Sequence, residues 1–229
     1  MRGIILEWPA LDVFGQMAAD EAVAVSRPEE FAVRFFDWSG AGATFGYAQT
    51  VSEVERALPP GTGTNYTRRP TGGGIVPHFS DLTFSCVFPD GGVLSPAQLY
   101  ARLHSAISAG LCLRGIGAEL YSGAADYAPS GPQGASRCFE KPVAQDLMSG
   151  GSKILGGAIR RFGNTVLYQG SLQLPGARAR AKELELVILR CLAAQWELKW
   201  ASRRADEAML AAAGALREKY ISSQWIRKL

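Results

Sequence analysis

The sequence lacks any long apolar run. No stretch approaches the ~18 consecutive apolar residues that a membrane-spanning helix needs. The N-terminus is apolar, but Glu7 and Asp12 interrupt it, so it does not have the clean apolar middle of a signal peptide. We therefore expect a cytoplasmic protein that neither spans nor binds a membrane.

Cysteine and histidine are also scarce. The four cysteines are Cys86, Cys112, Cys138 and Cys191. No two of them have C-x-x-C spacing, and only His78 and His104 could add imidazole ligands, so no structural metal site is expected. The spacing does not suggest a disulfide scaffold either, and we expect reduced thiols.

The charge is nearly balanced. There are 24 basic and 21 acidic residues, which leaves a net charge of +3. This weak excess would help an acidic partner to approach but does not indicate nucleic acid. A hydrophobic content of 47% and a charged content of 20% supply enough material for a core in 229 residues. We predict a single catalytic domain over residues 1–229.

Hydrophobic periodicity predicts helices and strands mixed along the chain. A strand and then a helix are expected within residues 1–26, and Ser95, Pro96 and Gly115 have the chemistry of helix start and stop signals. Further strands are predicted at 29–39, 40–50, 64–70 and 81–89, a hairpin at 153–175 that turns at Gly163-Asn164, and helices at 95–115, 182–200 and 205–220. This mixture indicates an α+β fold with a mixed, largely antiparallel sheet flanked by helices.

Three consecutive glycines interrupt the chain in "RRPTGGGIVPH", residues 68–78. No Gly-Lys-Ser/Thr follows, so this is not a P-loop, and the spacing is wrong for a dinucleotide-binding fingerprint. Glycines adopt positive φ and let the backbone approach a ligand closely, and their N–H groups can bind an anion or a carbonyl. With two arginines before the glycines and His78 after them, the segment predicts a ligand cradle; a flexible turn is the alternative.

A lysine begins the strand "KILGGAIRRF", residues 153–162. A fixed ammonium on Lys153 could face a phosphate or a polarised carbonyl. Gly156 and Gly157 remove side chains where a ligand would lie against the sheet. A solvated lysine at a strand end is the alternative, and Arg160 and Arg161 are expected at the surface.

Together these motifs resemble the lipoate–protein ligase A-like superfamily, in which Arg-Arg-x-x-Gly-Gly-Gly precedes a histidine and a Leu-Thr-Tyr/Phe-Ser strand. The resemblance extends over residues 17–22, 33–49, 150–174 and 216–225, and so spans nearly the whole chain. It implies the fold shared with biotin protein ligases and class II aminoacyl-tRNA synthetases. It also implies acyl transfer to a lysine of a carrier domain.

The same resemblance implies which residues line the acyl pocket. Family members hold an octanoyl or lipoyl group in a tunnel beside the glycine motif, where the lysine contacts the acyl carbonyl or an adenylate phosphate. Carried over to this chain, the lining residues are Arg69, Gly72, Gly73, Gly74, His78 and Lys153. Gly156 and Gly157 are added to these lining residues because they leave room for a ligand against the strand at 153–162. His78 could equally be a structural hydrogen bonder.

The segment "RCFEKPVAQDL", residues 137–147, resembles the cysteine-bearing segment of the octanoyltransferase branch. Cys138 follows a Gly/Ser/Ala/Pro-rich stretch and precedes Lys153 by fifteen positions. A nearby cation favours the thiolate, which is the nucleophile. We predict that Cys138 takes the acyl group from acyl carrier protein as a thioester, without a cofactor. The acceptor would be a lipoyl domain or the glycine cleavage H protein.

Two alternatives stay open. One is an ATP-dependent lipoate–protein ligase that needs ATP and Mg, with Lys153 on the adenylate and Cys138 incidental. The other is a non-catalytic acyl- or carrier-binding relative. Ligases often carry an extra C-terminal domain, whereas only two helices are expected after Leu174, which favours the transferase.

Some residues depart from the family pattern or are expected to have no role in the chemistry. Gly156-Gly157-Ala158-Ile159 stands where the family often has Gly-Ser-Ala-Gln, and Gln169 stands where many relatives have histidine. His104 is expected to be solvated, Asp81 and Asp146 to be loop or cap residues, and Cys86, Cys112 and Cys191 to be small buried apolar residues.

Overall fold

A computed structural model describes residues 1–26, 28–123 and 142–228. In chain order the elements are β1 (Arg2–Glu7), α1 (Val13–Val25), β2 (Phe31–Phe35), β3 (Ala43–Phe45), α2 (Val51–Ala57), β4 (Tyr66–Arg68), β5 (Val76–Pro77), β6 (Leu82–Pro89), α3 (Pro96–Cys112), β7 (Glu119–Leu120), β8 (Leu147–Ser149), β9 (Ser152–Phe162), β10 (Thr165–Leu172), α4 (Ala181–Trp196), β11 (Lys199–Arg204), α5 (Glu207–Ile221) and α6 (Ser223–Ile226).

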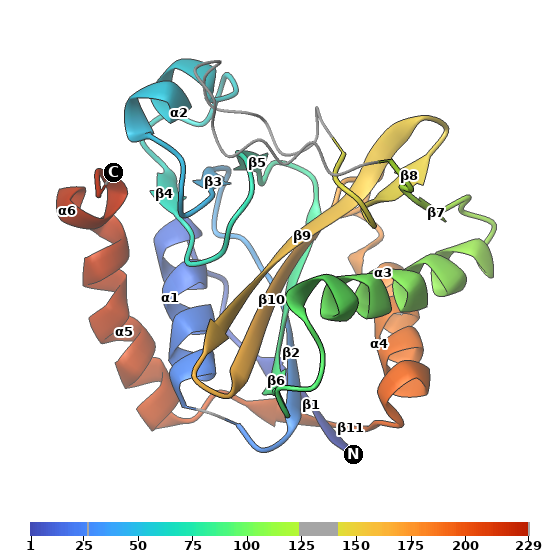
Figure 1. Ribbon diagram of the computed structural model, residues 1–229. Coiled ribbons are helices and arrows are strands. Elements are labelled where there is room, and N and C mark those ends of the chain that lie inside the picture. The colour runs from blue at the N-terminus through green and yellow to red at the C-terminus, as the bar shows by residue number, and fades with distance from the viewer. Residues whose placement is uncertain (27, 124–141, 229) are drawn as a thin grey trace.

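One large sheet organises these described elements. Its strand order is β11-β1-β2-β6-β10-β9-β8-β7. The β1 strand pairs in parallel with β11 and β2, whereas the pairs from β2 to β7 are antiparallel. A small sheet in the order β4-β3-β5 lies beside the large one (Figure 1). The predicted α+β class with a mixed, largely antiparallel sheet is confirmed.

Helices cover both faces of the large sheet. Figure 1 shows α3 and α4 on one side and α1 and α5 on the other. Residues of β6 alternate between these two layers, because successive side chains of a strand point to opposite faces. Phe84 and Cys86 join the core cluster under α3 and α4, and Val87 joins the cluster on the α1 side.

Local sequence chemistry explains several element boundaries. Ser95, which was predicted as a helix start signal, caps α3 through a reciprocal pair of hydrogen bonds with Gln98. The β9–β10 hairpin turns at Gly163-Asn164, as predicted, and Gly163 has φ +60°. These features place the β9 and β10 strands side by side, with Gly157 facing Gly170.

The C-terminal part differs from the expectation. The helix predicted at 182–200 ends at Trp196, because Glu197 takes a left-handed conformation with φ +52°. Residues Lys199–Arg204 instead form β11, an edge strand parallel to β1 that is exposed on both faces. A strand exposed on both faces has no alternation of apolar and polar residues, so hydrophobic periodicity did not predict it. The short helix α2 was also not predicted.

The cysteine expectations hold in part. Cys86 is buried, as predicted, but Cys112 is exposed and Cys191 is half-buried. None of these three described cysteines is in a disulfide. No described helix is both long and apolar enough to cross a bilayer.

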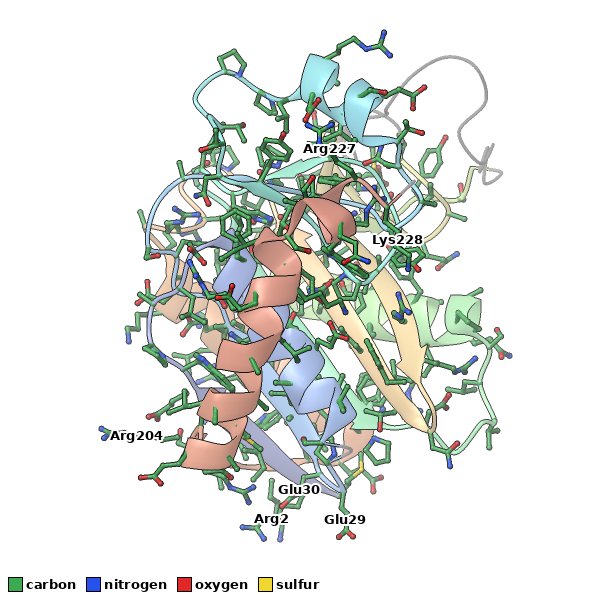
Figure 2. All side chains as sticks on the ribbon, turned by 90° about the vertical axis from the view of Figure 1, so that its left-hand side faces the viewer. Arg2, Glu29, Glu30, Arg204, Arg227 and Lys228 are labelled. Atoms are coloured by element: carbon green, nitrogen blue, oxygen red, sulfur yellow. The ribbon has the colours of Figure 1, made fainter. Side chains whose placement is uncertain are left out.

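Charged side chains mark the two ends of the molecule. Figure 2 shows Arg227 and Lys228 beside α6 at one end, and Arg2, Glu30 and Arg204 at the other. The helix α6 packs on β4 of the small sheet, which ends at Arg68, the first arginine of the glycine motif.

Candidate functional site

A narrow cavity lies where β9 and β10 meet α1 and the small sheet. Its volume is about 380 Å³ with the open mouth included. The lining residues are Met17, Phe36, Thr44, Arg69, Val76, His78, Thr83, Gly156, Gly157, Ala158, Gln169, Gly170 and Ser171. Arg69, His78, Gly156 and Gly157, four of the residues named from sequence, therefore meet at this cavity.

The two arginines of the motif face different surroundings. Arg68 is buried, and its guanidinium donates to the carbonyls of Trp225 and Ile226, at 3.2 and 2.9 Å. It therefore holds the end of α6 against the small sheet. Arg69 lines the cavity, with its Nε and Nη2 3.0 and 2.6 Å from the carbonyl oxygen of Gly72.

The triple-glycine turn supports Arg69 from behind. Among the described residues that line the cavity, Gly72, Gly73 and Gly74 do not occur. Gly73 has φ +90°, and its carbonyl lies against the backbone of Gly46, where a Cβ would come 2.7 Å from the Gly73 carbonyl carbon. The close approach that glycine permits is thus made to another segment of the chain.

Gln169 connects the glycine segment to α1. Its amide oxygen accepts from the Thr71 hydroxyl at 2.7 Å, and its Nε2 donates to Asp20 at 2.7 Å. Asp20 is fully buried and forms an ion pair with Arg34, and burial raises the pKa of its carboxyl despite that pairing. Gln169 is therefore fixed by hydrogen bonds on both sides.

His78 is both a cavity residue and a hydrogen bonder. Its Nδ1 lies 3.0 Å from Asp81 and its Nε2 2.9 Å from the Thr44 hydroxyl, while Trp38 stacks on the ring with centroids 4.3 Å apart. Both sequence interpretations of His78 therefore describe part of its environment.

Asp81 lies in a loop, as expected, but it is buried at the centre of several polar contacts. Thr83 and Ser171 donate hydrogen bonds to it, and Arg178 pairs with it at 3.3 Å. Burial alone would raise the pKa of the Asp81 carboxyl, but the interactions with His78 and the two hydroxyls outweigh burial and hold this pKa below its ordinary value.

Lys153 is not a solvated strand-end lysine. Its side chain is 3% exposed, and its ammonium lies 2.7 Å from Asp146. A Cβ added at Gly156 would come 2.7 Å from the Lys153 Nζ and closer still to Cε. The ammonium therefore lies directly against Gly156, which lines the cavity.

Two buried groups beside Lys153 were missed. Asp146 lies in a turn, as expected, but its burial and its ion pair with Lys153 were not anticipated. The expectation for His104 was wrong: it is buried, with Nδ1 2.8 Å from the Gln145 carbonyl and Nε2 2.8 Å from the Tyr168 hydroxyl. Burial, with a smaller contribution from the Lys153 charge, lowers the pKa of His104 to about 3.

The predicted nucleophile Cys138 lies outside the described residues, in the range 124–141. The described residues that flank this range pair with each other. The Tyr121 N–H donates to the Asp146 carbonyl at 2.8 Å, and the Gln145 N–H donates to the Tyr121 carbonyl at 2.9 Å. The chain therefore leaves and re-enters the described structure beside the carboxylate that holds Lys153.

Within the ranges that the structure covers, no three His, Cys, Asp or Glu residues are grouped so as to hold an ion.

Sequence comparisons match this arrangement to known proteins. The lipoyl protein ligase A/B catalytic domain model matches residues 12–184. Octanoyltransferase LipM of Symbiobacterium thermophilum is 32% identical over 167 residues, which are 69% of this chain and 60% of that protein. LipM of Moorella thermoacetica is 31% identical over 179 residues, 74% of this chain and 64% of that protein. The match thus spans less than two thirds of the length of these relatives.

Solved structures show the same fold. A putative lipoate protein ligase of T. acidophilum with bound lipoic acid superposes with a TM-score of 0.78 at 20% identity, over 100% of both chains. Lipoate-protein ligase A bound with ATP gives a TM-score of 0.76 at 19% identity, also over 100% of both chains. By its sequence and its fold, the chain belongs to the lipoyl protein ligase A/B catalytic domain family.

Proposed function

We propose that this protein is an acyltransferase of protein lipoylation. It would move an octanoyl or lipoyl group from acyl carrier protein through a thioester on Cys138 to a lysine of a lipoyl domain or glycine cleavage H protein. The observation that carries the proposal is the narrow cavity walled by Gly156, Gly157 and Gly170, with the ammonium of Lys153 behind it. The similarity to proteins named octanoyltransferase supports it.

The transfer has two balanced steps. The Cys138 thiolate attacks the donor thioester; a carbon–sulfur bond forms on Cys138, the donor carbon–sulfur bond breaks, and the donor leaves as a thiol after taking up a proton. The acceptor lysine amine then attacks the acyl-enzyme; a carbon–nitrogen bond forms, the carbon–sulfur bond to Cys138 breaks, and the proton lost by the amine restores the Cys138 thiol. Exchange between thioesters is nearly balanced and the amide is more stable, so no ATP or Mg is needed.

Fixed positive charge at the cavity is how the protein would lower the activation barrier. Negative charge develops on the acyl carbonyl oxygen in both steps, and preorganised cations in a water-poor site stabilise it. The Lys153 ammonium is fixed by Asp146, and the Arg69 guanidinium is fixed by the Gly72 carbonyl. The reaction belongs in the cytoplasm, where the nucleophilic thiol stays reduced.

An intact-mass measurement tests the proposal. The protein is incubated with octanoyl–acyl carrier protein, and an octanoyl adduct is expected that disappears in Cys138→Ala. Cys112→Ala, which removes an exposed thiol, is the matched control and should keep the adduct.

Other outcomes favour the alternatives. No adduct, with AMP released from ATP, Mg and lipoate, would replace the transferase by the ligase. Tight acyl binding with neither reaction would leave a binding module.

A further inference from the structure

A buried polar chain runs from the wall of the cavity to Lys153. We propose that Tyr100 and Asp146 are positioning residues that hold the Lys153 ammonium against Gly156, an inference that rests on the proposed transferase function. Neither residue was assigned a role in acyl transfer from the sequence.

Both oxygens of the Asp146 carboxylate are engaged. Oδ1 accepts from the Tyr100 hydroxyl, and Oδ2 lies 2.7 Å from the Lys153 ammonium and 2.7 Å from the Val143 N–H. Asp146 is fully buried. Rotation of the carboxylate would break at least one of these bonds in a place where water cannot replace it, so the carboxylate has one orientation.

Tyr100 connects this carboxylate to the cavity wall. Its hydroxyl accepts from the Gly157 N–H at 2.9 Å while it donates to Asp146. In the described pairing, β8 reaches only to Leu155 of β9, so the phenol takes the Gly157 N–H beyond the end of β8. Burial and the Asp146 charge raise the pKa of Tyr100 well above its ordinary value, so the phenol keeps the proton that it donates.

Lysine needs such a device more than arginine does. Its ammonium is a point charge on a flexible four-carbon stem, so its position depends on the partner that holds it. Here the partner is itself held by a tyrosine whose other bond is to the β9 backbone at the cavity. The position of the ammonium and the shape of the wall at Gly157 are therefore coupled through Tyr100.

Tyr168 supplies the matched control. It is buried near Tyr100, and its hydroxyl is hydrogen-bonded to Nε2 of His104. Its removal takes away the hydrogen bond to His104, which lies in the same buried region. Tyr100→Phe and Tyr168→Phe thus remove the same chemical group, the first within the buried polar chain that ends at Lys153 and the second outside it.

The first measurement is the chemical reactivity of Lys153 in the full chain. Reductive methylation with formaldehyde and a borohydride reagent is followed by peptide mass spectrometry, with the exposed Lys182 as internal reference. Tyr100→Phe should raise the labelling of Lys153 severalfold, because its carboxylate partner can now rotate. Tyr168→Phe should leave that labelling unchanged.

The second measurement is octanoyl transfer. Tyr100→Phe should lower kcat about tenfold at unchanged KM, because a misplaced Lys153 ammonium makes a weaker charge-assisted hydrogen bond to the acyl oxygen in the transition state. Asp146→Asn, of nearly the same size, should lower kcat about a hundredfold by the same reasoning, and Asp146→Glu should restore part of it.

The outcomes are separable. Equal effects of the two tyrosine substitutions, or wild-type labelling and kcat in Tyr100→Phe, would overturn the inference. Should Tyr100→Phe unfold, Asp146→Asn takes its place, and unchanged Lys153 labelling there would overturn the inference as well. Absence of an octanoyl adduct in the wild type would overturn the proposed function. The labelling would still report whether Tyr100 and Asp146 hold the Lys153 ammonium.

Discussion

Replacing Gly46 with alanine should displace the turn that holds Arg69. Gly46 directly follows β3, and a Cβ there would lie 2.7 Å from the carbonyl carbon of Gly73, 2.9 Å from that of Gly72, and closer still to the Gly73 carbonyl oxygen. Real Cβ atoms essentially never come within 3.0 Å of a heavy atom outside their own and the adjacent residues. All of these neighbours are backbone, so no side-chain rotation can relieve the clash.

The loss of stability in Gly46→Ala follows from the backbone movement that the clash requires. Separation of the two backbones pulls on the hydrogen bond from the Tyr47 N–H to the Thr71 carbonyl, which is 2.8 Å long and lies beside the contact. Overpacking in a rigid region costs about 1–3 kcal/mol, and a lost backbone hydrogen bond costs about 1 kcal/mol. The free energy of unfolding should therefore fall by about 2–4 kcal/mol. Octanoyl adduct formation should fall too, because Arg69 moves with the Gly72 carbonyl.

Urea denaturation measures this change, with Gly214→Ala as the control. A Cβ at Gly214, in the helix α5, would meet nothing within 4 Å. That variant should gain up to about 1 kcal/mol from alanine's better helix propensity. If Gly46→Ala unfolds at the same urea concentration as the wild type, the close approach is not rigid and the account of the triple-glycine turn is wrong.

Three further changes test other parts of the site. Gly156→Ala should push Lys153 off its position against the cavity wall and slow octanoyl adduct formation about a hundredfold; adduct formation at the wild-type rate would contradict this. Burial lowers the pKa of His104 to about 3, from 6.5 for an ordinary histidine. Between these two pH values the unfolded chain binds a proton that the folded protein does not. The free energy of unfolding should therefore fall by a few kcal/mol as the pH drops from about 6.5 towards 3. In His104→Gln the melting temperature should depend less steeply on pH over that range, and an identical dependence would contradict the assignment. Thr71→Val leaves the buried Gln169 oxygen without its donor and should cost about 1–3 kcal/mol in urea denaturation; an unchanged midpoint would show that this bond does not hold the glycine segment.

The elements that follow from local chemistry were predictable. Ser95, Pro96 and Gly115 marked α3, and Gly163-Asn164 marked the hairpin. Each signal depends on residues a few positions apart, which is the range over which caps, turns and periodicity act.

Pairing between distant segments was not predictable. β11 exists because Lys199–Arg204 lies beside β1, and its exposed residues carry no alternation that would mark a strand. His104 was expected to be solvated, although it shares helical spacing with the buried Ile107 and Leu111. That spacing was the available signal, but a polar residue on an apolar face stays buried only if distant groups satisfy it.

The sequence by itself determined the family, the glycine motif, the lysine strand and the order of most elements, because these depend on residue identity and short spacing. Only the tertiary structure decided that Arg69 faces the cavity while Arg68 holds α6, and that Asp146 and Tyr100 hold Lys153. Those choices depend on which buried donors and acceptors meet when separate segments pack together. Most such groups find a partner in the folded chain, and periodicity along the sequence carries no record of which one each finds.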